Sequence, residues 1–505
     1  MAAVDQIYGQ AQITVHEDMA HLVRENHESN PPKCKIIATM GPKCWEVEQI
    51  VSMMDAGMNV ARMNMSHGDN ESHLMVMQRL RDAMKQRPHT PIATMIDTRG
   101  REIRTGMFAA GGTVQLVAGQ TLKITTDYSF KGDVNCISCN YQELCTAGKV
   151  GQQILIANGS VMVEITEVGD TYVNTKVLNS AQLGEHKNMN LPGIVHDGPV
   201  LTDADKKDLT GFAIPQGVDF IAISFAQSAD DIAVVRKTLG PRGRRIKLIA
   251  KIESEEGLRN FDAILEKVDG VVVARGNLGM ELRTEKVFLA QKMMIAKANL
   301  AGKPVITATQ MLESMISNPR PTRAEASDVA NAVLDGTDCV MLSGETANGN
   351  FATDAVKAQH KICVEAESLI DYETLFRTIN SAAHTSLSDI VCASAVKTSL
   401  DMGLKLIVVL TETGSTARLV AKYRPSAMVF ACCASESTIA HLQVVRSVTA
   451  IQVPSFKGTE SVLHSALESA KERGLVKSGD CVVAVHGMKE EMPGGSSLMK
   501  VVQVE

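Results

Sequence analysis

The chain is poor in aromatic residues and has no long hydrophobic run. Phe, Trp and Tyr make up 4% of its 505 residues, although hydrophobic residues as a whole reach 45% and charged residues 21%, as in packed soluble domains. No apolar run approaches the ~20 residues that cross a bilayer. Charged residues such as Asp5 and Glu17 interrupt the N-terminal segment, where a signal peptide needs an unbroken apolar stretch. We therefore expect a folded cytoplasmic protein with no membrane partner.

The chain also has no strong excess of charge of either sign. It carries 51 basic and 57 acidic residues, a formal net charge of -6, which gives no general attraction to nucleic acid. The cysteines are scattered, and Cys136 and Cys139 form one C-x-x-C pair without a second pair at zinc spacing. A redox or metal role for this pair is the minor alternative. Reduced thiols in a cytosolic protein fit the pattern better.

Short runs rich in Val and Ile alternate with longer amphipathic stretches from Cys34 onward. This alternation is typical of buried parallel strands separated by helices. It predicts strands at 35–39, 59–63, 92–96, 220–224, 247–251, 270–274, 304–308 and 339–342, and helices that include 74–84, 229–239, 286–300 and 323–334. About eight such units favour an α/β fold with a (β/α)8 TIM barrel at 31–101 and 188–368. A doubly wound sheet is the structural alternative.

Three further regions complete the predicted organisation. Residues 102–187 contain short β-branched runs separated by Gly-containing turns, which indicates a small inserted all-β domain that acts as a lid, a β-barrel over the mouth of the main barrel. Residues 369–505 form a C-terminal α/β domain, with strands near 406–410, 428–431, 449–452 and 481–485. Residues 1–30 are expected to form an arm or short helices.

Polar residues follow the predicted barrel strands directly. In a barrel of this kind the active site gathers at the C-terminal ends of the strands. Lys251 and Glu253 alternate by two residues, so they share one face of their strand, and burying both charges without a function would be costly. The other strand-end residues are Arg62, Asn64, Ser66 and His67; Asp97, Thr98 and Arg99; Arg275, Gly276 and Asn277; and Thr309 and Gln310.

These residue types suit a phosphorylated acid and a metal ion. Glu253 is a candidate Mg²⁺ ligand, because this ion commonly takes one or two carboxylates together with substrate oxygens. Arg62 and Arg104 offer planar forks for phosphate, and Lys251 offers a point charge. The turn from Gly276 to Gly279 either binds an anion through its backbone or is simply a tight turn that needs glycine.

Several motifs together resemble those of the pyruvate kinase family. The segment Lys251–Gly257 is similar to the family signature. Further similar segments, in family order, are Ala61–Gly68, Ile96–Gly100, Glu102–Gly106, Asn190–Gly193, Ala308–Met315, Arg320–Glu325 and Met341–Ala347. The resemblance implies transfer of a phosphoryl group from phosphoenolpyruvate to ADP, giving pyruvate and ATP in glycolysis, with Mg²⁺ (or Mn²⁺) and K⁺.

The resemblance also implies roles for individual residues. Lys251, Arg62 and Thr309 are the expected catalytic residues, and Gly276 and Asn277 join them in binding the substrate. Glu253 and Asn277 are the expected Mg²⁺ ligands. The expected K⁺ ligands are Asn64, Ser66, Asp97 and Thr98, and the expected nucleotide-binding residues are Arg62, Asn64, His67, Arg104 and Lys187. Glu102 matches the carboxylate that the family associates with K⁺ dependence.

Some positions depart from the family pattern. Asn277 stands where the family usually has Asp, and an amide oxygen brings no negative charge to a metal. Ala157 and Asn158 replace two acids of the lid, Asn188 interrupts the usual Lys-Gly-Val-Asn run, and Gln227 replaces an Arg. These departures motivate the alternative of a catalytically weakened relative that binds phosphorylated metabolites in a regulatory role. An aldol-type barrel enzyme, resting on Lys251 near a metal carboxylate, is a third and more distant hypothesis.

The segment 411–416 resembles the phosphate-binding effector loop of the family. Its hydroxyl and glycine residues suit a phosphate, whereas the charge of Glu412 would repel a bisphosphate. A phosphorylated sugar effector and the absence of any activator are both open. The candidate effector residues are Thr411, Thr413, Gly414, Ser415 and Thr416. The resemblance further implies a homotetramer.

Overall fold

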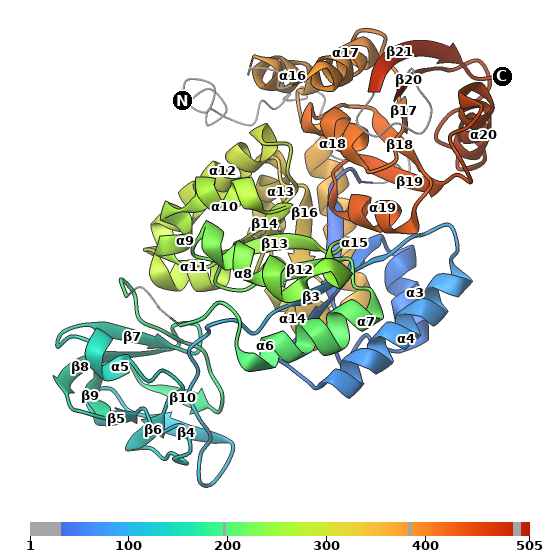
Figure 1. Cartoon of the computed structure of the whole chain (residues 1–505). Helices are drawn as coiled ribbons and strands as arrows, with labels where there is room; N and C mark the ends of the chain where they lie inside the picture. Colours follow the sequence, from blue (N-terminus) through green and yellow to red (C-terminus); the bar gives the residue numbers. More distant parts are fainter. Residues whose placement is uncertain (1–31, 195–197, 382–385, 488–495) are drawn as a thin grey trace.

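The computed structural model describes residues 32–194, 198–381, 386–487 and 496–505 (Figure 1). The arm expected at 1–30 lies outside the described residues. Among the described residues, no helix combines the length and the apolar character that a membrane span requires.

Eight parallel strands close into a barrel, in the order β1-β16-β15-β14-β13-β12-β3-β2. β1 pairs with both β2 and β16, so the barrel prediction is confirmed and the doubly wound alternative is wrong. The strands agree with the predicted ones to within one residue at each end: β1 (Lys35–Thr39), β2 (Met58–Asn64), β3 (Ala93–Asp97), β12 (Phe220–Ile223), β13 (Lys247–Ile252), β14 (Gly270–Ala274), β15 (Val305–Ala308) and β16 (Cys339–Leu342).

Helices surround the barrel and bury its outer face. One core cluster contains outward-facing strand residues such as Ile36 and Leu248 together with helix residues such as Leu80 and Val333. Helix α4 begins at Asn70, earlier than expected, because Asp69 caps it through the Ser72 amide and the first turn carries no apolar periodicity. The helices of this part are α3 (Val47–Asp55), α4 (Asn70–Gln86), α6 (Asp203–Asp208), α7 (Ile214–Gln216), α8 (Ala229–Leu239), α9 (Glu255–Arg259), α10 (Phe261–Lys267), α11 (Arg275–Glu281), α12 (Thr284–Leu300), α13 (Arg323–Leu334), α14 (Gly344–Ala347) and α15 (Ala352–Ser368).

The inserted region between β3 and β12 is a separate β domain with its own core. A six-stranded sheet has the order β11-β7-β8-β9-β5-β6, and β10 pairs with β4. The elements are β4 (Thr113–Leu116), β5 (Thr121–Thr125), β6 (Cys136–Ser138), α5 (Leu144–Ala147), β7 (Gln153–Ile156), β8 (Val161–Val168), β9 (Tyr172–Val177), β10 (Ala181–Gly184) and β11 (Met189–Asn190). Because β11 pairs with β7, the inserted sheet reaches past Lys187. We call this domain the lid.

The C-terminal domain is a five-stranded sheet in the order β19-β18-β17-β20-β21 with helices on its faces. Its strands are β17 (Leu406–Leu410), β18 (Met428–Cys433), β19 (Val448–Gln452), β20 (Cys481–Gly487) and β21 (Ser496–Gln503), and its helices are α16 (Tyr372–Asn380), α17 (Leu387–Asp401), α18 (Ser415–Lys422), α19 (Glu436–His441) and α20 (Thr459–Glu472). Edge strand β21 runs antiparallel to β20 and was not predicted from the sequence.

The C-terminal domain and the lid lie at opposite ends of the barrel (Figure 1). One core cluster joins side chains of the barrel strands, such as Val60 and Ile249, to side chains of the C-terminal domain, such as Ile407 and Val429. Arg424 of this domain also pairs with Asp338, which directly precedes β16, with 2.9 Å between Nη1 and Oδ1. The C-terminal domain therefore covers the N-terminal ends of the strands and leaves their C-terminal ends to the lid.

Candidate active site

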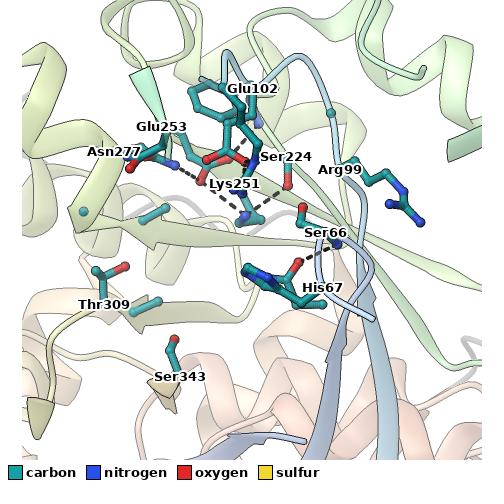
Figure 2. A pocket seen from close by; sticks show the side chains of 18 of the residues that line it. Ser66, His67, Arg99, Glu102, Ser224, Lys251, Glu253, Asn277, Thr309 and Ser343 are labelled. Atoms are coloured by element: carbon teal, nitrogen blue, oxygen red, sulfur yellow. Dashed lines mark hydrogen bonds and ion pairs between the residues drawn. The ribbon is translucent and has the colours of Figure 1, made fainter. Parts of the chain in front are cut away.

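A cavity of about 880 Å³ lies between the C-terminal ends of the barrel strands and the lid (Figure 2). Barrel residues and lid residues both line it, so the site is shared between two domains. The predicted site residues that line it are Arg62, Asn64, Ser66, His67, Arg104, Lys187, Lys251, Glu253, Gly276, Asn277 and Thr309.

Lys251, near the end of β13, places its ammonium group among three oxygen-bearing side chains. Its Nζ lies 3.1 Å from Asp97 Oδ2 and 3.2 Å from Glu253 Oε1, and it donates to Ser224 Oγ at 3.0 Å. Burial acts against this charge, but the carboxylates of Glu253 and Asp97 outweigh it and raise the pKa of Lys251. The ammonium group is therefore charged and held in one place.

Arg62, on β2, forms a two-pronged ion pair with Asp97 at the end of β3. Its Nε lies 2.9 Å from Oδ1 and its Nη2 lies 2.7 Å from Oδ2, while Nη1 donates to Thr39 Oγ1 at 2.8 Å. Asp97 is 1% exposed. Burial disfavours its charge, but Arg62 and Lys251 lower its pKa to about 2. Asp97 thus acts as the fixed anion that orients both cations.

Glu253 accepts hydrogen bonds on both carboxylate oxygens. Oε2 accepts from the Phe225 backbone amide at 2.8 Å. Oε1 accepts from Asn277 Nδ2 at 2.8 Å, as Figure 2 shows. Among the described residues, no group of three or more His, Cys, Asp or Glu side chains is placed to enclose a metal ion. A single carboxylate with a neighbouring amide fits Mg²⁺, which commonly completes its shell with water and substrate oxygens.

The four residues expected to bind K⁺ come from adjacent strand ends. Asn64 and Asp97 are register partners on β2 and β3, and Asn64 Oδ1 accepts from the Ser66 amide at 3.1 Å. Thr98 Oγ1 accepts from the Ser224 amide at 3.0 Å. Asp97 and Thr98 are not among the residues that line the cavity, since both are buried behind its wall. The group is rich in oxygen atoms, which suits a hard monovalent cation.

The lid contributes cations to the far wall of the cavity. Arg104 Nη2 lies 2.6 Å from Glu102 Oε2, and Arg104 Nη1 donates to the His186 carbonyl at 2.8 Å. Burial raises the pKa of Glu102. Burial, followed by the charge of Arg104, lowers the pKa of His67. Both pKa shifts favour the neutral form of the side chain relative to an exposed one.

Two asparagines at the tip of the lid hold each other in place. Asn188 Nδ2 donates to Asn158 Oδ1 at 2.8 Å, and the backbone N–H of Asn158 donates to Asn188 Oδ1 at 3.2 Å. Both residues line the cavity. The side-chain amide of Asn158 therefore stands where the family resemblance led us to expect an acid, and its partner Asn188 stands where the resemblance led us to expect a glycine.

The start of α11 packs closely against Thr309, which follows β15. A Cβ atom on Gly276 would lie 2.7 Å from Thr309 Cγ2, so only glycine fits there. Thr309 has a φ of 78°, a left-handed conformation that costs energy in a non-glycine residue. Arg275 Nη2 donates to the Thr309 carbonyl at 2.8 Å and holds this turn. The Thr309 side chain consequently lies next to Gly276 in the cavity wall.

The predicted effector residues lie in the C-terminal domain, away from this cavity. Gly414, with a φ of 78°, precedes α18, and Thr413 Oγ1 donates to Ser415 Oγ at 3.1 Å. Thr411 and Thr416 are buried.

Several cavity residues were not singled out as site residues from the sequence. Ser224 and Ser343 follow β12 and β16, so the rule that marked the other strand ends would have found them. Asn140, Glu185 and His186 come from lid loops, where no periodicity marks a position as facing the barrel. Only the orientation of the lid brings them into the site.

Comparison with known proteins agrees with the family resemblance of the sequence motifs. The family model for the pyruvate kinase barrel domain matches residues 31–356, and the model for its alpha/beta domain matches residues 389–502. A pyruvate kinase from Eimeria tenella is 55% identical over 488 residues, which cover 96% of this chain and 92% of the relative. A cytosolic pyruvate kinase isozyme from Glycine max is 45% identical and covers 95% of this chain and 98% of the relative.

Solved structures agree with these sequence matches. A Cryptosporidium parvum pyruvate kinase has a TM-score of 0.90 at 47% identity, covering 97% of this chain and 100% of that chain. A structure of the C. parvum enzyme in complex with ADP has a TM-score of 0.90 at 48% identity, covering 96% and 99% of the two chains. The agreement extends over all three domains, and the chain therefore belongs to the pyruvate kinase family and is a phosphotransferase.

Proposed function

We propose that this phosphotransferase moves the phosphoryl group of phosphoenolpyruvate to ADP, giving pyruvate and ATP in glycolysis. The observation that carries this proposal is the placement of Lys251, whose Nζ lies within the cavity at 3.1 Å and 3.2 Å from two buried carboxylates. A cation fixed in this way can stabilise a phosphoryl group in flight without reorganising during the reaction. The ADP complex of the C. parvum relative supports ADP as the nucleotide.

Each residue of the proposed site has its own role in the reaction. Lys251 on β13 faces the phosphoryl group and the enolate oxygen that it leaves, and Arg62 holds phosphate oxygens from β2, which β12 and β3 separate from β13. Thr309 and the Gly276 backbone bind the carboxylate end of the substrate. As the phosphoryl group passes to the β-phosphate of ADP, the enolate that remains gains a proton on carbon and becomes pyruvate. Catalysis consists of positioning and of charge stabilisation.

Two cations complete the proposed site. Glu253 and Asn277 would hold Mg²⁺ (or Mn²⁺), which, when bound, supplies positive charge to the phosphoryl oxygens. Asn64, Ser66, Asp97 and Thr98 would hold K⁺ on the same side as Arg62. The donor chemistry of both groups supports this assignment, because each offers oxygen ligands.

The lid residues are proposed to bind the nucleotide. Arg104 and Lys187 line the wall that faces the barrel, and Asn64, His67 and Arg62 line the wall opposite. A diphosphate between these walls meets cations on both sides. The paired asparagines Asn158 and Asn188 add amide groups there and no negative charge.

Regulation and assembly are proposed from the resemblance. The loop with Thr411, Thr413, Gly414, Ser415 and Thr416 is a candidate site for a phosphorylated sugar, and the enzyme is proposed to be a cytoplasmic homotetramer. The name of the Glycine max relative, a cytosolic isozyme, supports the location. Light scattering tests the assembly, and a monomer would contradict it. Titration with a hexose monophosphate and with a hexose bisphosphate, read as a change in rate, tests the loop.

A coupled assay tests the activity. Purified protein with Mg²⁺, K⁺, ADP and phosphoenolpyruvate is expected to form pyruvate, and omission of either cation is expected to lower the rate strongly. Folded protein that makes no pyruvate under these conditions would refute the proposal. The comparisons lend no support to the alternative of a catalytically weakened relative.

A further inference from the structure

Helix α11 touches the lid at two places while its first turn lines the active site. Gly276 and Asn277 lie in that first turn and line the cavity. At the other end of the helix, Asn190 of strand β11 donates from Nδ2 to Glu281 Oε1 at 3.2 Å. The helix therefore spans the distance between the substrate residues and the lid.

The tip of the lid makes the second contact. A Cβ atom on Gly159 would lie 3.3 Å from Met280 Cε, so the tip packs directly on the penultimate residue of α11. Ala157, Asn158 and Gly159 have φ values of 53°, 56° and 81°, and this left-handed run turns the chain toward the helix. Strand β11 pairs with β7, which leads into this tip, so both contacts belong to one strand-paired part of the lid.

The two chain segments that join the lid to the barrel are anchored differently. On the way in, Arg101 donates to Gln227 Oε1 at 2.7 Å and pairs with Asp231 Oδ1 at 2.6 Å, both in or next to α8. In the segment that returns from the lid to the barrel, Asn190 makes a side-chain hydrogen bond to Glu281 of α11. Both segments and Glu281 line a small cavity of about 30 Å³, which places Glu281 beside the two connections between the lid and the barrel.

We propose that Glu281 is a positioning residue that latches the returning segment of the lid to α11. The latch sets the distance between the lid residues Arg104 and Lys187 and the substrate residue Asn277. Glu281 is not among the residues that line the main cavity, so it acts on the nucleotide through the position of the lid. This inference rests on the proposed transfer to ADP.

Three variants separate the latch from a general effect on folding. Glu281→Ala removes the acceptor for Asn190, and Glu281→Gln keeps an acceptor oxygen in nearly the same shape. Because burial raises the pKa of Glu281 to about 7, much of the native population is protonated near neutrality, and the glutamine variant resembles it. Glu285→Ala, at an exposed position on α12, is the matched control.

The expected result is a change in ADP binding alone. Loss of one hydrogen bond in Glu281→Ala should raise KM for ADP about two- to tenfold, with KM for phosphoenolpyruvate unchanged. Glu281→Gln should restore most of the affinity, and Glu285→Ala should match the parent. An unchanged KM for ADP in Glu281→Ala would overturn the proposal. So would KM values for ADP and for phosphoenolpyruvate that rise by the same factor in both Glu281→Ala and Glu281→Gln.

Hydrogen exchange gives a second measurement that needs no activity. Amides in 187–191 and 152–160 should exchange faster in Glu281→Ala than in the parent, while amides in β18 should not change. Identical exchange in the lid segments would refute the latch. If parent and variants all fail to make pyruvate, the proposed function fails, and exchange alone decides whether Glu281 holds the lid.

Discussion

At the scale of single residues, the centre of the site is a balanced group of charges. Arg62 and Lys251 face Asp97 and Glu253, and the shared Asp97 carboxylate contacts both cations. Charges buried together in this way cost solvation free energy that good geometry must offset. Two cations with fixed positions suit the phosphorylated dianion that we propose as the substrate.

Replacing Lys251 by Met should remove most of the activity. The variant lacks the cation that we propose faces the phosphoryl group, and we expect kcat to fall about 10²- to 10³-fold. Steady-state kinetics measure the loss, and thermal unfolding checks that the protein is folded. Lys85→Met, at a lysine that is 73% exposed, should keep the parental rate. A folded Lys251→Met enzyme with normal kcat would exclude the assigned role.

The ionisation of Asp97 should make stability fall in acid. Its pKa is lowered from 3.8 to about 2 despite burial, because Arg62 and Lys251 favour the charge. This contribution is present above pH 4 and is lost as the pH falls through about 2, a change on the order of 2 kcal/mol. The unfolding free energy of Asp97→Asn should lack this part of the pH dependence. Asp354→Asn, at an exposed site, should retain it.

Replacing Asn277 by Asp should strengthen the binding of Mg²⁺. The new carboxylate would stand beside Glu253 Oε1, 2.8 Å from the present amide nitrogen. We expect the Mg²⁺ concentration for half-maximal rate to fall about tenfold, because a second anion raises metal affinity. Asn348→Asp, at an exposed position, is the control. A large rise in kcat would instead favour the weakened-relative alternative.

At the scale of elements, α11 and the turn after β15 depend on close contact. The first turn of α11 approaches Thr309 at a distance that leaves no room for a methyl group on Gly276. The same helix carries Asn277 in the site and Glu281 at the lid. A small displacement of α11 would therefore disturb the proposed substrate and metal sites together with the contact to the lid.

Replacing Gly276 by Ala should move this helix. The added methyl group would lie 2.7 Å from Thr309 Cγ2, so we expect a loss of about 1–3 kcal/mol in stability and a lower kcat/KM for phosphoenolpyruvate. Urea unfolding and steady-state kinetics measure the two effects. Gly211→Ala is the matched control, since no atom beyond its chain neighbours and the adjacent backbone of its own helix lies within 4 Å of the added group. Equal behaviour of both variants would show that the approach is not tight.

At the scale of the whole molecule, the barrel is held between two domains with different tasks. The lid completes the cavity at one end, and the C-terminal domain shares a hydrophobic core with the barrel at the other. Arg424 donates to Asn299 and pairs with Asp338 across that second interface, and both charged side chains are buried. Hydrophobic packing and a buried ion pair therefore join the C-terminal domain to the barrel.

Replacing Arg424 by Met should loosen this interface. It leaves the buried Asp338 carboxylate without its cation, which typically costs about 3–5 kcal/mol. Urea unfolding should show the loss, and a separate transition for the C-terminal domain would locate it. Arg377→Met breaks an exposed pair with Glu373 and should cost under about 1 kcal/mol. Equal costs for the two variants would contradict a stabilising role for Arg424.

The sequence alone determined the barrel strands and the polar residues at their ends. Alternating apolar runs reveal parallel strands, and the C-terminal ends of parallel strands meet at one face, so Lys251, Glu253, Asn277 and Thr309 had to come together. Only the tertiary structure decided the contacts between domains: the Asn158–Asn188 pair, the docking of Arg424, and the hydrogen bond from Asn190 to Glu281. These contacts join segments far apart in the chain, and they depend on how whole domains pack, which local periodicity does not encode.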